Sequence, residues 1–105
     1  MADTGRDAET AVRIIVRGRV QGVGYRAFVL SQAQARGIAG WVRNRRNGDV
    51  EAVFAGPGGA VKALCEICRE GPPYAAVEAL DIIPADRQEL SEVDMQDRFV
   101  LRPTL

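Results

Sequence analysis

A glycine-rich segment between an expected strand and an expected helix limits the possible folds of this chain more than any other feature. Its sequence is Gly18-Arg19-Val20-Gln21-Gly22-Val23-Gly24-Tyr25-Arg26. The apolar, β-branched residues 12–16 predict a strand before it, and apolar periodicity predicts a helix over residues 25–35 after it. Three glycines within seven residues allow positive φ, so successive N–H groups can converge on one point. The segment therefore predicts a tight strand–loop–helix connection whose backbone can bind a ligand.

The chemistry of this connection favours an oxyanion. The loop leads into a helix N-terminus, where unpaired N–H groups and the helix dipole attract negative charge. Arg26 falls in the first turn of that helix, where its guanidinium can bind the same anion through two parallel hydrogen bonds. We therefore expect a phosphate-sized anion site with a fixed positive charge at its rim. The alternative is a structural glycine-rich turn beside a solvated arginine.

Two well-known phosphate-binding loops do not fit this segment. A P-loop requires Lys and then Ser or Thr after its last glycine, whereas Tyr25 and Arg26 follow Gly24. Residues 22–27 match the G-x-G-x-x-A pattern of dinucleotide-binding folds. Those folds need about six strands, which this chain cannot supply. A different anion-binding fold is therefore expected.

The patterns along the chain predict the element order βαββαβ. We expect strands over 12–16, 38–44, 50–55, 76–83 and 98–102, helices over 25–35 and 60–70, a break and helix entry at 56–59, and a loop or irregular hairpin over 84–97. Asn47-Gly48 favours a hairpin turn between the second and third strands. This order predicts an α+β, ferredoxin-like sandwich in which two helices cover one face of an antiparallel sheet.

Periodicity also predicts which residues face the core. In the first strand, Val12, Ile14 and Val16 should face inward while Arg13 and Arg17 face water. The expected inward residues of the two helices are Tyr25, Phe28, Val29, Ala33, Val61, Leu64, Cys65 and Cys68. Gly37 is expected to stop the first helix.

A second segment, after the first expected helix, points to a family. Its sequence is Gly40-Trp41-Val42-Arg43-Asn44-Arg45-Arg46-Asn47-Gly48-Asp49-Val50, and it continues through Glu51 to Gly56. Together with residues 18–26 it closely resembles the acylphosphatases, small enzymes that hydrolyse the carboxyl–phosphate bond of acyl phosphates. Both signatures match along their whole length, and a looser similarity extends over residues 10–104. The resemblance implies this fold for residues 11–105, as an acylphosphatase-like domain, and acylphosphatase activity.

The expected topology places residues 18–26 beside the end of the second expected strand, where Asn44 lies. An asparagine at a strand end often simply caps a turn. Beside a phosphate site its amide can instead bind a water molecule and orient it toward phosphorus. The resemblance implies that second role, because the family's water-positioning asparagine corresponds to Asn44 and its phosphate-binding arginine to Arg26. With the loop amides, the expected phosphate-binding residues are Arg19, Val20, Gln21, Gly22, Val23, Gly24 and Arg26.

The implied chemistry suits a chain that contains no histidine. An acyl phosphate releases a carboxylate, so the leaving group needs no proton, and catalysis can consist of holding the phosphoryl group and orienting water in line. We therefore expect no metal and no cofactor, an acyl phosphate as the small-molecule substrate, and inorganic phosphate as product and inhibitor. Arg45 stands where many relatives carry a smaller polar residue, which leaves the support of Asn44 open.

Composition sets the remaining expectations. At 105 residues the chain is one domain, with a polar tail over residues 1–10 that we expect to be disordered. Fourteen basic and 14 acidic residues cancel, so no nucleic-acid partner is expected. The cluster Arg43, Arg45 and Arg46 predicts a solvated turn that can attract anionic substrate. Without an apolar membrane span or signal peptide, a cytoplasmic monomer with no membrane association is expected.

The pattern Cys65-Glu66-Ile67-Cys68 resembles a metal or redox motif. The chain has only these 2 cysteines and no histidine, so a closed four-ligand zinc site cannot form within it. Redox pairs sit at a helix N-terminus, whereas this pair falls inside the second expected helix. Two buried packing residues are therefore expected.

Two other classes of function stay open on the sequence. One is a catalytically silent module that binds phosphate or an acyl phosphate, since the same fold occurs as a domain of larger carbamoyl-processing enzymes. The other is an RNA-binding ferredoxin-like domain. Such domains expose stacking aromatics on central strands, and residues 12–16 contain none.

Overall fold

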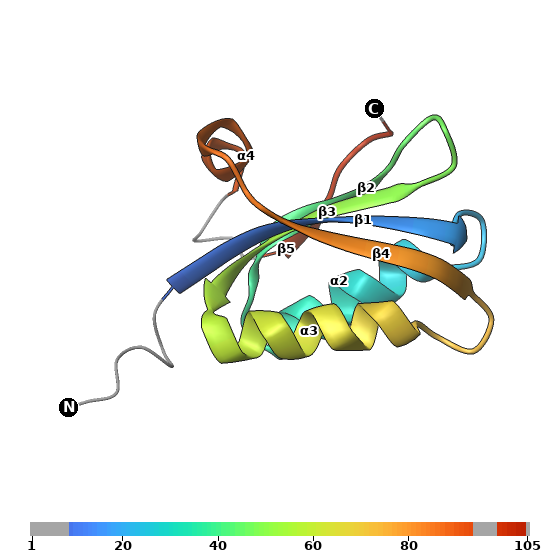
Figure 1. Ribbon diagram of the computed structural model, residues 1–105, viewed down its shortest axis with the longest axis horizontal. Coiled ribbons are helices and arrows are strands. Elements are labelled where there is room, and N and C mark those ends of the chain that lie inside the picture. Colours follow the sequence, from blue (N-terminus) through green and yellow to red (C-terminus); the bar gives the residue numbers. More distant parts are fainter. Residues whose placement is uncertain (1–8, 94–98, 105) are drawn as a thin grey trace.

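The computed structural model describes residues 9–93 and 99–104. Strands and helices alternate along most of this length (Figure 1). They are β1 (Glu9–Arg19), α2 (Tyr25–Ala35), β2 (Ala39–Asn44), β3 (Val50–Pro57), α3 (Gly58–Glu70), β4 (Ala76–Pro84), α4 (Arg87–Ser91) and β5 (Phe99–Leu101). The bounds of α2 agree with the expected helix over residues 25–35.

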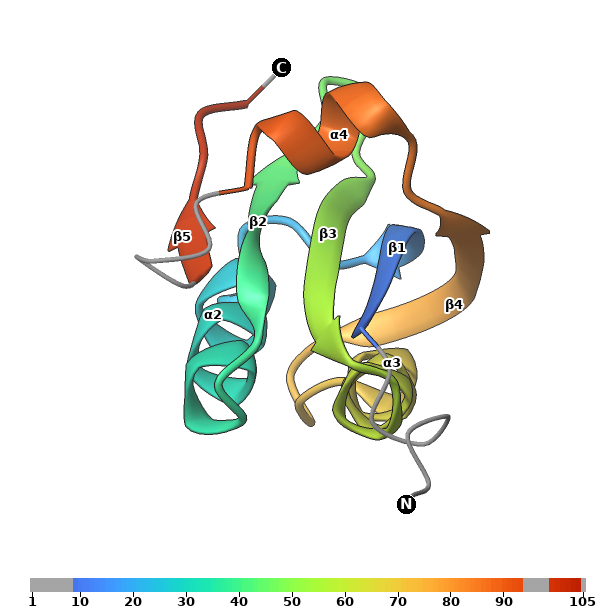
Figure 2. The same ribbon diagram turned by 90° about the vertical axis from the view of Figure 1, so that its left-hand side faces the viewer.

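The sheet has five strands in the order β4-β1-β3-β2-β5 (Figure 2). The first four pair antiparallel, as predicted for a ferredoxin-like α+β sandwich. The pairing of β5 differs from the expected antiparallel sheet, because β5 runs parallel to β2, with Val42 opposite Leu101. This direction follows from the topology. β4 runs antiparallel to β2. The chain reverses its direction between β4 and β5, so β5 runs parallel to β2 at the other edge of the sheet.

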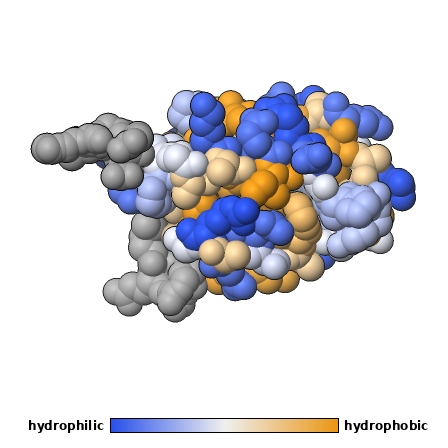
Figure 3. All heavy atoms as spheres, turned by 90° about the horizontal axis from the view of Figure 1, so that it is seen from below, coloured by the Kyte–Doolittle hydropathy of each residue, from blue (hydrophilic) through white to orange (hydrophobic). Residues whose placement is uncertain are grey.

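Two long helices, α2 and α3, cover one face of the sheet (Figure 1). Ile14 on β1 and Ala52 on β3 are register partners on that face, and both are fully buried. The predicted inward residues of the helices are buried, except that Phe28 is only partly so. On the solvent side of these helices hydrophilic groups lie among apolar ones (Figure 3). Within residues 9–93 and 99–104, no helix has the length and apolar character needed to cross a membrane.

The opposite face of the sheet carries the short helix α4 (Figures 1 and 2). The sequence prediction of a loop or irregular hairpin missed this helix. Asp86 accepts a hydrogen bond from the Glu89 N–H, and the Glu89 side chain accepts one from the Asp86 N–H, each at 2.8 Å. This reciprocal capping box is visible in the sequence as Asp-x-x-Glu and was the available signal. Beneath this face Trp41 and Val53 are buried.

Two predicted boundaries need correction, and a third falls outside the described residues. β1 begins at Glu9, so residues 9 and 10 belong to a strand, whereas residues 1–8 of the expected disordered tail lie outside the described residues. Residues 56–59 contain the expected helix entry, at Gly58, but no separate break, since β3 continues to Pro57, paired with Glu9. Residues 94–98, which include the end of the expected loop and the start of the last expected strand, lie outside the described part of the chain.

Candidate functional site

The loop between β1 and α2 depends on glycine for two different reasons. Gly22 and Gly24 have φ of 74° and 83°, and no atom lies within 4 Å of a Cβ added at Gly22, so conformation selects glycine there. At Gly18, a Cβ would lie 2.2 Å from the Ala76 carbonyl oxygen, so close approach of β4 also demands glycine. The β1–β4 register shifts at this point, between Arg17 and Gly18. Pairing with β4 continues past this bulge to Arg19, opposite Ala76, and the loop begins after that residue.

The loop ends at a helix N-terminus that is open to an anion. Gly24 is the N-cap residue of α2, in the left-handed conformation, and no side chain caps this end among the described residues. The first turn contains no acidic residue. Because the first N–H groups of a helix have no partner within it, they and the helix dipole offer positive potential to a ligand.

A cavity of about 180 Å³ lies at this end of α2. Its lining residues are Val20, Gly22, Gly24, Tyr25, Arg26, Ala27 and Leu101. Four of the predicted phosphate-binding residues, Val20, Gly22, Gly24 and Arg26, are therefore brought together. Leu101, from β5, was not predicted, and only the similarity of the chain's C-terminal end to the family pointed toward that segment.

The other three predicted loop residues do not line this cavity. Arg19 is exposed at the end of β1. Val23 packs against the hydrophobic core. Gln21 directs its side chain away from the cavity, toward the β2–β3 hairpin. For these three, only the backbone amides can serve the predicted role.

Asn44 is the last residue of β2 and shares the helical face with Val42, two positions earlier. Val42 is fully buried in the core and pairs with Leu101, which lines the cavity. The Asn44 Oδ1 atom is buried and has no hydrogen-bond partner within the described residues. A buried acceptor without a partner is costly unless a ligand or water satisfies it. Asn44 thus has the hydrogen-bonding capacity that its predicted role needs.

The loop and the end of β2 are joined directly. Gln21 Nε2 donates to the carbonyl oxygens of Arg45 at 2.7 Å and Asp49 at 2.8 Å. Those residues bracket the hairpin turn, which is itself closed by the Arg45 N–H donating to the Asp49 oxygen at 2.8 Å. The predicted adjacency of the phosphate loop to the end of β2 is therefore present in the structure.

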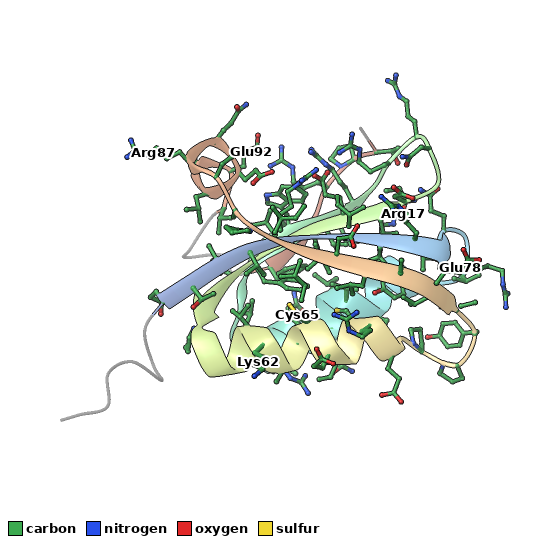
Figure 4. The ribbon with its side chains drawn as sticks, in the orientation of Figure 1. Arg17, Lys62, Cys65, Glu78, Arg87 and Glu92 are labelled. Carbon is green, nitrogen blue, oxygen red and sulfur yellow. The ribbon has the colours of Figure 1, made fainter. Side chains whose placement is uncertain are left out.

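The residue after Asn44 faces the other side of the sheet. Arg45 Nη1 lies 3.0 Å from Glu51 Oε1, and the same carboxylate also pairs with Arg43 at 2.9 Å and Arg13 at 2.6 Å. The predicted water-facing position of Arg13 and the predicted solvated cluster of Arg43 and Arg45 are therefore wrong; only Arg46 of that cluster is exposed. Arg17 is exposed, as predicted, on this face (Figure 4).

The charge state of Glu51 follows from its partners. Its burial raises the pKa of the carboxyl, but hydrogen bonds from Arg13, Arg43 and Arg45 outweigh that effect and lower the pKa below its ordinary value of 4.5. Glu51 is therefore a permanent anion near neutral pH and has no proton to give. Its single negative charge balances only one of the three positive charges, and Glu89 adds a second carboxylate 3.0 Å from Arg13.

The two cysteines lie inside the fold, as expected. Figure 4 shows Cys65 between α3 and the sheet, while Lys62 on the same helix points away. Burial raises the pKa of the Cys65 thiol to about 11 and that of Cys68 to about 12, so neither is an effective nucleophile near neutral pH. Within the described residues, no group of three or more His, Cys, Asp or Glu side chains could hold a metal ion.

Comparison with known proteins matches this site and fold to one family. The acylphosphatase family model matches residues 12–99. The acylphosphatase of Rhodopseudomonas palustris (strain BisB18) is 52% identical over 97 residues, which cover 91% of this chain and 98% of the relative. The crystal structure of acylphosphatase from Bacillus subtilis is 38% identical, with a TM-score of 0.77, over 88% of this chain and 97% of that chain.

A second solved structure agrees over a longer part of the chain. The acylphosphatase from Coxiella burnetii is 33% identical, with a TM-score of 0.78, over 97% of this chain and 100% of that chain. Because the family match covers residues 12–99 and these relatives are spanned almost end to end, the chain belongs to the acylphosphatase family of hydrolases.

Proposed function

We propose that this protein hydrolyses acyl phosphates by in-line attack of a water molecule that Asn44 orients. In this proposal Arg26 and the backbone N–H groups of residues 19–24 hold the phosphoryl group. The observation that carries it is the buried Oδ1 of Asn44, which has no partner within residues 9–93 and 99–104 and lies at the strand end that Gln21 joins to the glycine-rich loop.

The phosphoryl group would occupy the cavity at the N-terminus of α2. Arg26 contributes a guanidinium that can bind two phosphoryl oxygens at once, and it makes no ion pair with another described residue that would occupy it. The positive φ of Gly22 and Gly24 allows neighbouring N–H groups to turn toward the same centre. These donors are fixed before the substrate arrives, so they can stabilise charge in the transition state without reorganising.

Asn44 would act on the nucleophile. Its Oδ1 can accept a hydrogen bond from a water molecule, whose lone pair then points away from the amide and toward phosphorus. Orientation of this kind lowers the barrier because the attacking oxygen is already in line with the bond that breaks. The neutral amide cannot remove a proton, so its contribution is geometric.

The leaving group explains why no catalytic acid is required. Water oxygen forms a bond to phosphorus, the bond between phosphorus and the acyl oxygen breaks, and the carboxylate leaves with the electron pair. Both protons of the water end on the phosphate product, so the reaction gives a carboxylate and dihydrogen phosphate. The buried carboxylate of Glu51 lies on the opposite face and is held ionised by three arginines, so it plays no part as an acid.

The remaining elements of the proposal follow from the same arrangement. No metal or cofactor is needed, because the loop amides and Arg26 supply the positive potential. Inorganic phosphate, the product, would compete for the same cavity. The protein would act as a monomer, since every residue assigned to the reaction comes from one chain.

Comparing two substrates tests this function. The purified protein should hydrolyse a simple aromatic acyl phosphate, with inorganic phosphate as a competitive inhibitor and no loss of rate in a strong chelator. It should hydrolyse an alkyl phosphate monoester far more slowly, because an alkoxide leaves poorly without an acid. Equal rates on both substrates, or activity that chelation abolishes and added metal restores, would contradict the proposed mechanism.

A further inference from the structure

Gln21 belongs to the phosphate loop, yet its side chain makes its hydrogen bonds elsewhere. The single nitrogen Nε2 donates to the carbonyl oxygens of Arg45 at 2.7 Å and of Asp49 at 2.8 Å. An amide nitrogen has two hydrogens, so both are used in these bonds. The Gln21 side-chain nitrogen therefore has no donor left for a phosphate oxygen.

The two acceptors define the geometry of the turn that follows Asn44. The Arg45 oxygen also accepts from the Gly48 N–H at 3.1 Å, and the Asp49 oxygen also accepts from the Arg45 N–H at 2.8 Å. Each carbonyl has two lone pairs, and each therefore makes two hydrogen bonds. Gln21 is inserted between the two carbonyls that close the hairpin, and it fixes the backbone of Arg45 on the loop side.

The Arg45 side chain is fixed on the other side of the sheet. Its Nη1 pairs with the buried carboxylate of Glu51 at 3.0 Å, so the residue next to Asn44 is held at its backbone and at its guanidinium. The peptide that joins Asn44 to Arg45 has little freedom to rotate under these constraints. The Asn44 Oδ1 atom, which has no hydrogen-bond partner among the described residues, is consequently held in a fixed position relative to the loop that contains Gln21.

We propose that Gln21 is a positioning residue, whose side chain sets the alignment of the Asn44-bound water with the phosphoryl group on the loop. This inference rests on the function proposed above, since it presumes that Asn44 orients the water. Gln21 acts through Arg45 and does not touch the reacting atoms with its side chain. Its backbone N–H stays available for the phosphoryl group.

The proposal predicts a separation of kcat from phosphate binding. Gln21→Met keeps the length of the side chain, adds no charge and removes both donors. It should lower kcat on the order of 10- to 100-fold, the cost of a misaligned reacting group. The inhibition constant of inorganic phosphate should stay close to that of the unaltered protein. Gln34→Met is the matched control, because it removes an amide-to-carbonyl bond between α2 and β5, Gln34 Nε2 to the Phe99 oxygen at 3.4 Å, and should leave kcat unchanged.

A double-mutant cycle identifies the residue through which Gln21 acts. In the Asn44→Ala background, Gln21→Met should have almost no further effect on kcat, because there is no longer an oriented water to misalign. Full additivity of the two losses would contradict the proposal, as would a weakened affinity for phosphate with kcat unchanged. Gln21→Asn is a second variant, to be used if Gln21→Met does not fold. It keeps the amide, but its side chain is one methylene too short to reach both carbonyls. A folded Gln21→Asn protein with unaltered kcat would also overturn the proposal.

The same measurements separate this inference from the proposed function. If Asn44→Ala itself retains full turnover, the assignment of the water to Asn44 fails. If Asn44→Ala loses turnover while both Gln21 variants keep theirs, only the positioning role of Gln21 fails.

Discussion

Asn44 and Arg45 are adjacent in the sequence but face opposite sides of the sheet. Their polar groups differ in whether they have a bonding partner. Asn44 presents a buried oxygen with no partner among the described residues, beside a loop in which Gly22 and Gly24 have positive φ. Arg45 presents its charge to Glu51, a carboxylate that is 2% exposed and paired with three arginines. The Asn44 oxygen thus keeps its hydrogen-bonding capacity available, whereas the Arg45 guanidinium is already paired with a carboxylate.

This difference separates the residues proposed to act on the substrate from residues that stabilise the fold. An unsatisfied buried polar atom destabilises the empty protein and is retained where a ligand or water completes it. A buried ion-pair network contributes to the stability or specificity of the fold. Substitutions on the two faces should accordingly affect different measurements, activity on the Asn44 side and stability on the Glu51 side.

The largest effect is expected at Arg26. Replacing it with alanine removes the guanidinium that is proposed to bind two phosphoryl oxygens. Turnover of an acyl phosphate should therefore fall about 10³-fold or more, and binding of inorganic phosphate should also weaken. Arg26→Lys should restore little, because a point charge cannot reproduce the planar fork. The measurements are kcat, KM and the phosphate inhibition constant.

Arg36→Ala is the matched control for Arg26. It removes an exposed arginine at the other end of α2, which bonds only to Gln32 among the described residues, and should leave these constants unchanged. An Arg26→Ala protein that binds phosphate normally would show that the cavity at α2 is not the phosphate site.

The opposite pattern is expected for Glu51. Glu51→Gln removes the carboxylate that pairs with Arg43 and Arg45 and leaves Arg13 with Glu89 alone among the described residues, so it should lower the free energy of unfolding by about 3 kcal/mol. The folded variant should keep most of its kcat, because the hairpin backbone is still held by Gln21. Denaturant unfolding and steady-state kinetics on the same preparation measure both quantities. Glu78→Gln, an exposed glutamate on β4, is the control and should change neither (Figure 4).

The contribution of Glu51 should depend on pH in a defined direction. Its pKa is lowered in the folded protein, so its stabilisation is fully present above the ordinary value of 4.5 and is lost as pH falls through the folded pKa. The difference in Tm between the unaltered protein and Glu51→Gln should therefore shrink as the pH is lowered from neutrality to well below 4.5. A Tm difference that stays constant over this range would mean that the carboxylate charge is not the stabilising element.

The smallest effect is expected for the cysteines. The Cys65→Ala, Cys68→Ala double variant should lose roughly 1–2 kcal/mol of stability through small cavities under α3. Its turnover should be unchanged and insensitive to reductant, because burial raises both thiol pKa values. A redox-dependent activity that disappears in the double variant would overturn the packing role.

Local sequence patterns correctly predicted the structural features that depend on residues close together in the sequence. The helix over residues 25–35, the positive φ of Gly22 and Gly24, and the inward position of Val61 and Leu64 all follow from periodicity or from glycine chemistry. The boundary at Pro57 was missed because pairing of β3 with Glu9, far away in the sequence, extends the strand through residues that would otherwise form a turn.

The candidate site was predictable to a similar extent. Arg26, the loop and Asn44 lie in two contiguous motifs, so their positions could be expected once the topology was known. The side-chain role of Gln21 could not be predicted, because its acceptors are backbone carbonyls 24 and 28 residues away and carry no side-chain signature. Arg13 was expected in water for a similar reason, since its partner Glu51 is 38 residues distant.

The proposed mechanism gives Arg26 and Asn44 separate roles, and one measurement distinguishes these roles. It is the comparison of kcat with the phosphate inhibition constant in folded Asn44→Ala protein. Loss of the oriented water should reduce kcat on the order of 10²-fold or more, by analogy with losing one aligned polar group, while phosphate binds almost normally. Full activity in Asn44→Ala, or a loss of phosphate binding as severe as that in Arg26→Ala, would contradict the account.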